Sequence, residues 1–121
     1  MRVVIRCDNP DVEDEWSWGV SRQWDLSEWS EKIEPKLSEW ASLTWAEIDT
    51  HSSDTGHKMH HNMSCDDICE EAQDRMLEIE RFFDVLFRFR AGNLERVWGY
   101  RIAEVFHVLW YDPTHEIYPT D

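Results

Sequence analysis

The chain has 121 residues, and its 26 acidic side chains outnumber the 12 basic ones, which gives a formal net charge of −14. This length predicts a single domain over residues 1–121, and the aromatic content of 13% supplies enough apolar area for a hydrophobic core. No apolar run approaches the roughly 20 residues of a membrane span, and no signal-peptide pattern is present, so we expect a cytoplasmic protein with no membrane partner. The three cysteines, an odd number, favour free thiols over a disulfide framework.

The first predicted elements are a short strand and a helical segment. β-Branched residues predict a strand over residues 2–7, and the sequence Asp-Asn-Pro at 8–10 predicts a turn after it. Over residues 26–40 the apolar side chains recur at intervals of three and four, which is typical of an amphipathic helix. Pro35 interrupts this pattern, so it either kinks one helix or lies in the first turn of a second.

Two further helices are predicted in the middle of the chain. Thr44 and Glu47 have the spacing of a capping box, which predicts a short helix over residues 45–48. Residues 49–63 have no apolar period and predict a polar, histidine-rich loop. The clearest helical pattern extends over residues 64–83, with acidic residues in its first turn, where the helix dipole favours negative charge.

The C-terminal third changes to a period of two, which is typical of strands. We expect strands over residues 85–90, 96–102, 105–111 and 115–118, joined by short turns. The predicted fold class is therefore α+β, in which two to three N-terminal and central helices pack on a C-terminal antiparallel meander of about four strands. The N-terminal strand can add to this sheet.

The charge is unevenly distributed along the chain. Residues 1–80 contain 20 acidic and 7 basic side chains, whereas residues 81–121 contain 6 acidic and 5 basic ones. The five basic residues of the second segment are all arginines, which make planar, bidentate contacts with phosphate or carboxylate. These arginines therefore either form an anion-binding face or pair with the carboxylates of the protein itself.

The C-terminal third contains the motifs Arg-Val-Trp-Gly at 96–99 and Trp-Tyr-Asp-Pro-Thr-His at 110–115. These motifs resemble those of a group of small bacterial and phage proteins whose activity is not established. The likeness extends upstream through Leu-Thr-Trp-Ala-Glu-Ile at 43–48 and the histidine-rich loop.

The order of the C-terminal strands is more distantly similar to the sheet of the RelE/ParE-type toxins of toxin–antitoxin modules. This resemblance implies a toxin-like, phage-defence or mobile-element protein that has an antitoxin as partner and acts as an endoribonuclease without metal or cofactor. Basic side chains would hold the phosphate, and a histidine or aromatic residue would assist attack by the 2′-hydroxyl. The net charge of −14 disfavours RNA binding. The candidate catalytic residues are Arg88, Arg90, Arg96, His107, His115 and Tyr118.

The same residues also have a structural interpretation. Asp112 and His115 can close the Asp-Pro-Thr-His turn through local hydrogen bonds, while Arg96 pairs with Asp112 or Glu95. If they form a site instead, the helix over 64–83 covers one face of the sheet. At least three of the candidates, with Arg101 added, then form a concave or edge patch on the opposite face or at its rim.

A metal site is an alternative for the central segment. His57, His60 and His61 precede Cys65 and Cys69, and these side chains could converge on a tetrahedral zinc ion. An exposed histidine loop followed by a helix with a buried cysteine fits the pattern equally well. In a third interpretation, His60 or His61 reaches the arginine face as an acid or base.

The surplus of acidic residues suggests a second class of function. A non-enzymatic interaction module, such as an inhibitor or a DNA mimic, would use a concentrated negative charge to bind a basic protein. The sequence contains no phosphate-binding glycine loop, dinucleotide fingerprint or EF-hand spacing, so we expect no cofactor.

Overall fold

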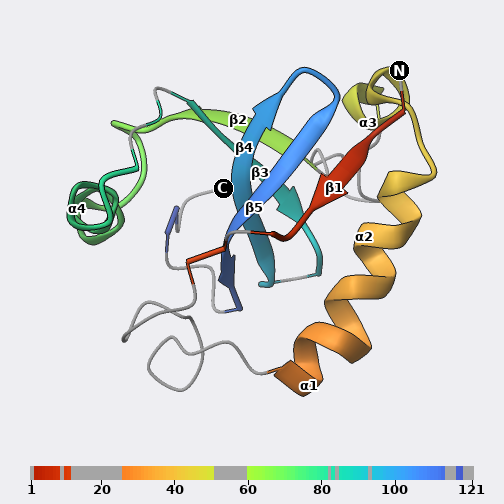
Figure 1. Ribbon diagram of the computed structural model, residues 1–121, viewed down its shortest axis with the longest axis horizontal. Coiled ribbons are helices and arrows are strands. Elements are labelled where there is room, and N and C mark those ends of the chain that lie inside the picture. Colours follow the sequence, from red (N-terminus) through yellow and green to blue (C-terminus); the bar gives the residue numbers. More distant parts are fainter. Residues whose placement is uncertain are drawn as a thin grey trace.

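The computed structural model describes residues 2–8, 10–11, 26–50, 60–81, 83, 85–92, 94–113 and 117–118. Its centre is a five-stranded sheet with the order β1-β5-β4-β3-β2 (Figure 1). The strands are Val4–Arg6, His60–Ser64, Val85–Arg90, Arg96–Ile102 and Val105–Asp112, numbered β1 to β5 in chain order. The strands β2 to β5 pair antiparallel, and β1 runs parallel to β5. The predicted α+β fold class is confirmed.

The first helical segment is continuous but changes its pitch. It consists of α1 (Leu26–Glu28), the π-helical turn η2 (Trp29–Ile33) and α2 (Glu34–Ala41). The backbone N–H of Glu34 bonds to the carbonyl of Trp29, five residues earlier, and Pro35 follows at the start of α2. Because proline has no N–H, the carbonyl of Glu31 has no ordinary partner four residues later, and the wider turn fits this gap. Pro35 thus divides the segment, in agreement with the sequence pattern.

The predicted capping box is confirmed at α3 (Trp45–Thr50). The backbone N–H of Glu47 donates to Thr44 Oγ1, and the N–H of Thr44 donates to Glu47 Oε1, both at 3.1 Å. These reciprocal bonds satisfy two donors that a helix N-terminus otherwise leaves without partners.

The prediction for the central segment was wrong at both ends of its helix. Residues 60–64, which were expected to form a loop and the start of the helix, form strand β2, and α4 covers only Glu70–Glu78. Strand β2 is stabilised by pairing with β3, from His60 opposite Phe89 to Ser64 opposite Val85. This long-range pairing overrides a weak local strand preference.

The early end of α4 also has a local cause. Glu80 has a φ of 56°, and the N–H groups of Glu80 and Arg81 bond back to the carbonyls of Leu77 and Met76. This is the Schellman pattern, which normally places glycine at the left-handed position. A glutamate at this position does not indicate the end of a helix, so the helix predicted from the sequence extends to residue 83.

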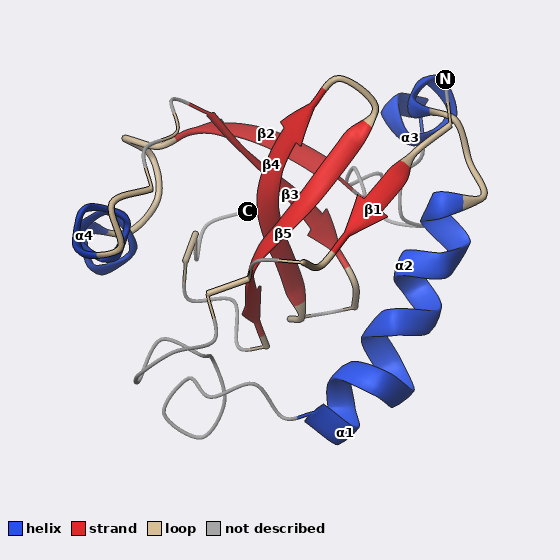
Figure 2. Cartoon of the chain, in the orientation of Figure 1, coloured by secondary structure: helices blue, strands red, loops and turns tan. Residues whose placement is uncertain are grey.

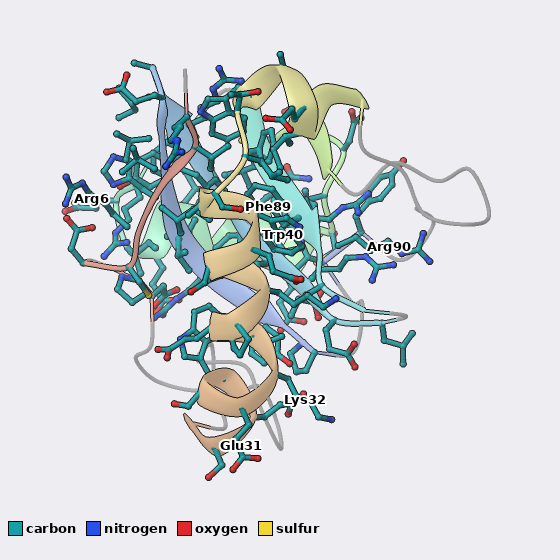
Figure 3. All side chains as sticks on the ribbon, turned by 90° about the vertical axis from the view of Figure 1, so that its right-hand side faces the viewer. Arg6, Glu31, Lys32, Trp40, Phe89 and Arg90 are labelled. Carbon is teal, nitrogen blue, oxygen red and sulfur yellow. The ribbon has the colours of Figure 1, made fainter. Side chains whose placement is uncertain are left out.

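Two hydrophobic clusters lie on opposite faces of the sheet, as the separated helices in Figure 2 indicate. The helices η2, α2 and α3 pack on one face, where Trp40 stacks on Phe89 with ring centroids 4.4 Å apart (Figure 3). On the other face, α4 contributes Ala72 and Met76 to a cluster with Leu86 and Trp98. No helix within the described ranges is long and apolar enough to cross a membrane.

A β-bulge in β5 decides which side chains face each cluster. Trp98 pairs with Trp110, whereas Gly99 pairs with Val108, so Leu109 is an extra residue. Leu109 and Trp110 consequently both join the α4 cluster. The bulge therefore shifts the alternation of all later residues of β5 by one position.

The predicted last strand, over residues 115–118, is not seen in the described part of the chain. Its first two residues lie outside the described ranges, and Ile117–Tyr118 form a bend rather than a strand. Ile117 is fully buried in the α4 cluster, and its N–H donates to Asp112 Oδ2 at 2.8 Å. The predicted turn chemistry of Asp112 is thus present, with Ile117 as the partner.

Candidate functional site

Three arginines of β3 and β4, namely Arg88, Arg90 and Arg96, lie on the face of the sheet that α4 covers. Leu86 belongs to the α4 cluster, so alternation places Arg88 and Arg90 on the same face. In the strand register Arg88 lies opposite Trp98, and Arg90 lies opposite Arg96. On its other side, Arg96 lies opposite Asp112 of β5. The expectation that these side chains gather on the face opposite the α4 helix was wrong for Arg88, Arg90 and Arg96.

Burial distinguishes these arginines from an open anion-binding site. Arg88 is 5% exposed and Arg96 is 2% exposed. Arg96 Nη1 donates to the carbonyls of Gly92 at 3.1 Å and Glu95 at 3.2 Å, and Arg90 Nε reaches the carbonyl of Gly92 at 3.4 Å. Arg90 and Arg96 therefore stabilise the turn between β3 and β4 through hydrogen bonds to its carbonyl groups.

Arg101 lies apart from this group. Its guanidinium stacks over the Trp45 ring, 3.9 Å from the centroid, on the face packed by α3. Its Nε donates to the carbonyl of Ala103 at 2.8 Å, and the residue is exposed. The cation–π contact holds the charge at the surface.

The remaining candidates are in three different surroundings. His107 stacks on Tyr100 with ring centroids 5.0 Å apart, and its Nδ1 lies 3.7 Å from Asp8 Oδ1. Tyr118 is half-buried and packs against the α4 cluster. His115 lies outside the described residues. The structure thus brings Arg88, Arg90, Arg96 and His107 to one face but leaves only Arg90 and His107 partly exposed.

The candidate zinc ligands are only partly described. His57 and the side chains of His60 and His61 lie outside the described part of the structure. Cys65 Sγ donates to the carbonyl of Phe83, and both Cys65 and Cys69 pack against the α4 cluster. Among the side chains that the structure describes, no three His, Cys, Asp or Glu residues come together as metal ligands.

A buried ionic network under α4 was not predicted from the sequence. Asp11 and Arg75 are each 3% exposed, and both carboxylate oxygens of Asp11 accept bonds of 2.8 Å from Arg75. Trp110 Nε1 donates to the same carboxylate at 2.9 Å. Asp11 is separated from Trp110 by 99 residues, so sequence spacing gave no sign of this contact.

The inward orientation of Arg75 leaves α4 with a strongly acidic outer surface. Arg75 is the only basic residue between positions 66 and 80, and its guanidinium pairs with the buried Asp11 and with Glu78. The acidic α4 surface consists of seven exposed carboxylates: Asp66, Asp67, Glu70, Glu71, Asp74, Glu78 and Glu80. Leu77, which is 62% exposed, lies among them. This surface combines dense negative charge with an apolar side chain.

A groove of about 240 Å³ lies between β1 and α2 and includes Cys7, Trp29, Glu34 and Leu37 in its lining. Cys7 is an exposed residue, yet partial burial raises the pKa of its thiol to about 11, and the nearby carboxylates of Glu34 and Asp8 act in the same direction. The thiol is therefore protonated at neutral pH, and it lacks the low pKa of a catalytic cysteine.

We expect this thiol to be alkylated slowly by iodoacetamide. A pKa of about 11 in place of 9.0 reduces the thiolate fraction at pH 8, and the greater nucleophilicity of the more basic thiolate offsets part of the loss. The net rate should be about tenfold below that of a cysteine in an unfolded peptide. Peptide mapping of Cys7 modification between pH 7 and pH 10 should show a rate that still rises at pH 10. A plateau near pH 9 would contradict the assignment, and Glu34→Gln should raise the rate at pH 8.

The hydroxyl group of Tyr111 is buried between β5 and the first helical segment. Tyr111 donates its hydroxyl to Glu28 Oε1 at 2.6 Å and contacts Trp29 edge-on, so it joins the first helical segment to β5. Burial, followed by this hydrogen bond, raises the pKa of Tyr111 far above its usual range. Its role is structural.

Comparison of the chain with protein-family models, with curated proteins and with solved structures gave no match.

Proposed function

We propose that the protein is a non-enzymatic interaction module that binds a basic protein through the acidic α4 surface. The observation that carries this proposal is the burial of Arg75 against Asp11. Arg75 is the only basic residue of a segment with seven exposed carboxylates, and of these seven its buried guanidinium pairs with Glu78 alone, so it offsets little of their negative charge. Concentrated surface charge of one sign steers and selects partners of the opposite sign.

The arrangement of α4 indicates the chemistry of the partner. Glu70, Asp74 and Leu77 are spaced by four and three residues, so they share one helix face. A ligand that matches this face carries lysine or arginine side chains around one apolar side chain. Such a pattern is typical of a basic amphipathic segment of a protein.

Metal-free RNA cleavage, which the resemblance to RelE/ParE-type toxins implies, has less support. Cleavage requires cationic side chains that contact the phosphate and stabilise its developing charge. Arg88 and Arg96 are 5% and 2% exposed, so two of the candidate arginines are covered by protein. The endoribonuclease function remains a prediction.

Binding of a labelled amphipathic peptide of lysine and leucine tests the proposal by fluorescence anisotropy. The double variant Glu70→Lys/Asp74→Lys should weaken binding about tenfold or more, because it reverses the charge on the proposed face. The matched control is Glu31→Lys/Glu39→Lys, which makes the same charge change on the first helical segment, where both residues are exposed (Glu31 is labelled in Figure 3). The control should weaken binding by less than about threefold.

Two results would contradict the proposal. Equal weakening by both variants would show that only the total charge matters, and an affinity that is unchanged between low and high salt would exclude charge-driven recognition. RNA cleavage in the presence of EDTA that is lost in Arg90→Ala would favour the endoribonuclease function instead. Thermal melts of each variant verify that it is folded.

A further inference from the structure

The sheet opens between β3 and β4 at one end. The two strands pair from Arg90 opposite Arg96 to Phe87 opposite Gly99, and the pairing ends there. Beyond that point β3 continues to Val85 along β2, while β4 continues to Ile102 along β5. Figure 1 shows the start of β3 diverging from the end of β4.

The register identifies the backbone groups that face this opening. The N–H of Ala91 bonds to the carbonyl of Glu95. Because backbone groups in a strand point alternately to either side, Phe89, Phe87 and Val85 also direct their N–H and C=O toward β4. At the turn between β4 and β5, Ile102 lies opposite Val105 and directs its N–H and C=O toward β5. The preceding residue, Arg101, therefore directs its N–H and C=O to the other side, toward β3. Val85 and Arg101 are therefore the next pair of the ladder, and no residue in the described ranges bonds to these sides of them.

A hollow lies at the same place. It has a volume of about 580 Å³ and is lined by Val85, Leu86, Phe87, Arg101 and Ala103. Val85 is 52% exposed at its rim, and the neighbouring Ile102 is 61% exposed. We call this feature the β3–β4 notch. It combines backbone groups available for strand pairing with apolar side chains that water still contacts.

The charge of the notch selects the ligand. Among the described residues that line the notch, Arg101 is the only ionisable one, and the others are apolar. The guanidinium is held by Trp45 and by its Nε bond to Ala103, which leaves its other N–H donors facing no described acceptor. A fixed arginine beside an apolar hollow is complementary to a carboxylate that follows an apolar side chain.

We propose that the β3–β4 notch binds an extended acidic peptide segment of another protein. The segment pairs its backbone with Val85 or Arg101 as a short added strand, places an apolar side chain against Val85, and directs a carboxylate to Arg101 on the same face of the sheet. This site is separate from the acidic α4 surface and selects the opposite charge. It does not depend on the function proposed above.

Amide exchange with a defined probe tests this inference directly. The probe is the acetylated and amidated peptide Glu-Val-Glu-Val-Glu, titrated into ¹⁵N-labelled protein. At saturation the amide of Val85, that of Arg101 or both should exchange at least about tenfold more slowly than in the free protein, because the paired amide acquires a hydrogen-bond partner. The same peptide with methylated backbone nitrogens should bind at least about tenfold more weakly. Protection at the outer edge of β2, or no protection, would overturn the proposal.

Charge variants provide a second, independent test. Arg101→Glu should weaken binding of the acidic probe by about tenfold or more, whereas Arg6→Glu makes the same charge change on β1, two strands away from β4, and should have an effect below about threefold. If Arg101→Glu fails to fold, the methylated peptide still decides the question with the unmodified protein. Equal binding of Lys-Val-Lys-Val-Lys would overturn the charge assignment. Protection of Val85 and Arg101 that rises with protein concentration alone would identify a second copy of this chain as the occupant and overturn the proposal.

Discussion

Asp11→Leu is expected to lower the free energy of unfolding by about 3–5 kcal/mol, because it leaves a buried guanidinium without its main partner. Both oxygens of Asp11 accept bonds of 2.8 Å from Arg75, which is 3% exposed, and Trp110 Nε1 loses its acceptor in the same change. Glu78 lies 3.0 Å from Arg75 Nη1 but is 65% exposed, so it replaces only part of the lost interaction. Urea denaturation of the variant and the unmodified protein measures the difference.

The double variant Asp11→Leu/Arg75→Met distinguishes two contributions to the free energy of unfolding. One is the destabilisation caused by an unpaired buried guanidinium, and the other is the stabilisation by the ion pair itself. Removing both partners leaves no buried ion at this position, so the double variant should recover most of the lost stability. The N–H of Trp110 still lacks an acceptor, which keeps a cost of about 1 kcal/mol. A double variant that is less stable than Asp11→Leu alone would show that the charge pair itself, rather than the unpaired guanidinium, determines the stability.

Gly99→Ala is expected to destabilise the protein by about 3 kcal/mol, since β4 and β5 approach closely at the bulge. A Cβ atom at this position would lie 2.0 Å from the carbonyl oxygen of His107 and 2.8 Å from Cζ of Phe106. The first contact is with backbone of the adjacent strand and the second is with a fully buried ring, so neither group can move away without disturbing the sheet.

Gly92→Ala is the matched control for this prediction. Its Cβ would also meet an atom at 2.0 Å, but that atom is the terminal carboxylate oxygen of Glu95, which can rotate away. We expect a loss below about 1 kcal/mol from Gly92→Ala, measured by the same denaturation experiment. Similar losses in the two variants would mean that strand preference, and not the close approach of β4 to β5, explains the effect.

The parts of the fold that the sequence predicted correctly are those with strong local signals. Alternating side chains identified β3, β4 and β5, the Thr44–Glu47 capping box identified α3, and Pro35 marked the division of the first helical segment. Each signal depends on neighbouring residues, so no knowledge of the tertiary structure was required.

The parts that were missed depend on partners far along the chain or on rare local choices. Strand β2 is formed by pairing with β3, although its own sequence is polar and lacks β-branched residues. The bulge at Leu109 and the left-handed Glu80 have no distinctive sequence pattern.

The candidate site shows the same limit. Alternation correctly placed Arg88 and Arg90 on one face, but which face α4 would cover could not be determined from periodicity. The burial of Arg88 and Arg96, and the contact of Asp11 with Arg75, were therefore not predicted.

The parallel pairing of β1 with β5 constrains the order in which the sheet can be completed during synthesis. Val4 lies opposite Val105, so the first strand must wait for the last one, while the turns within β3–β4–β5 join strands that are neighbours along the chain. Bringing distant residues together costs more chain entropy than closing a short hairpin. On the ribosome, β1 consequently emerges before β5 and is paired only after β5 has followed. Its short length and the charged side chain of Arg6 are features that limit unwanted pairing of an open strand edge with other chains during that interval.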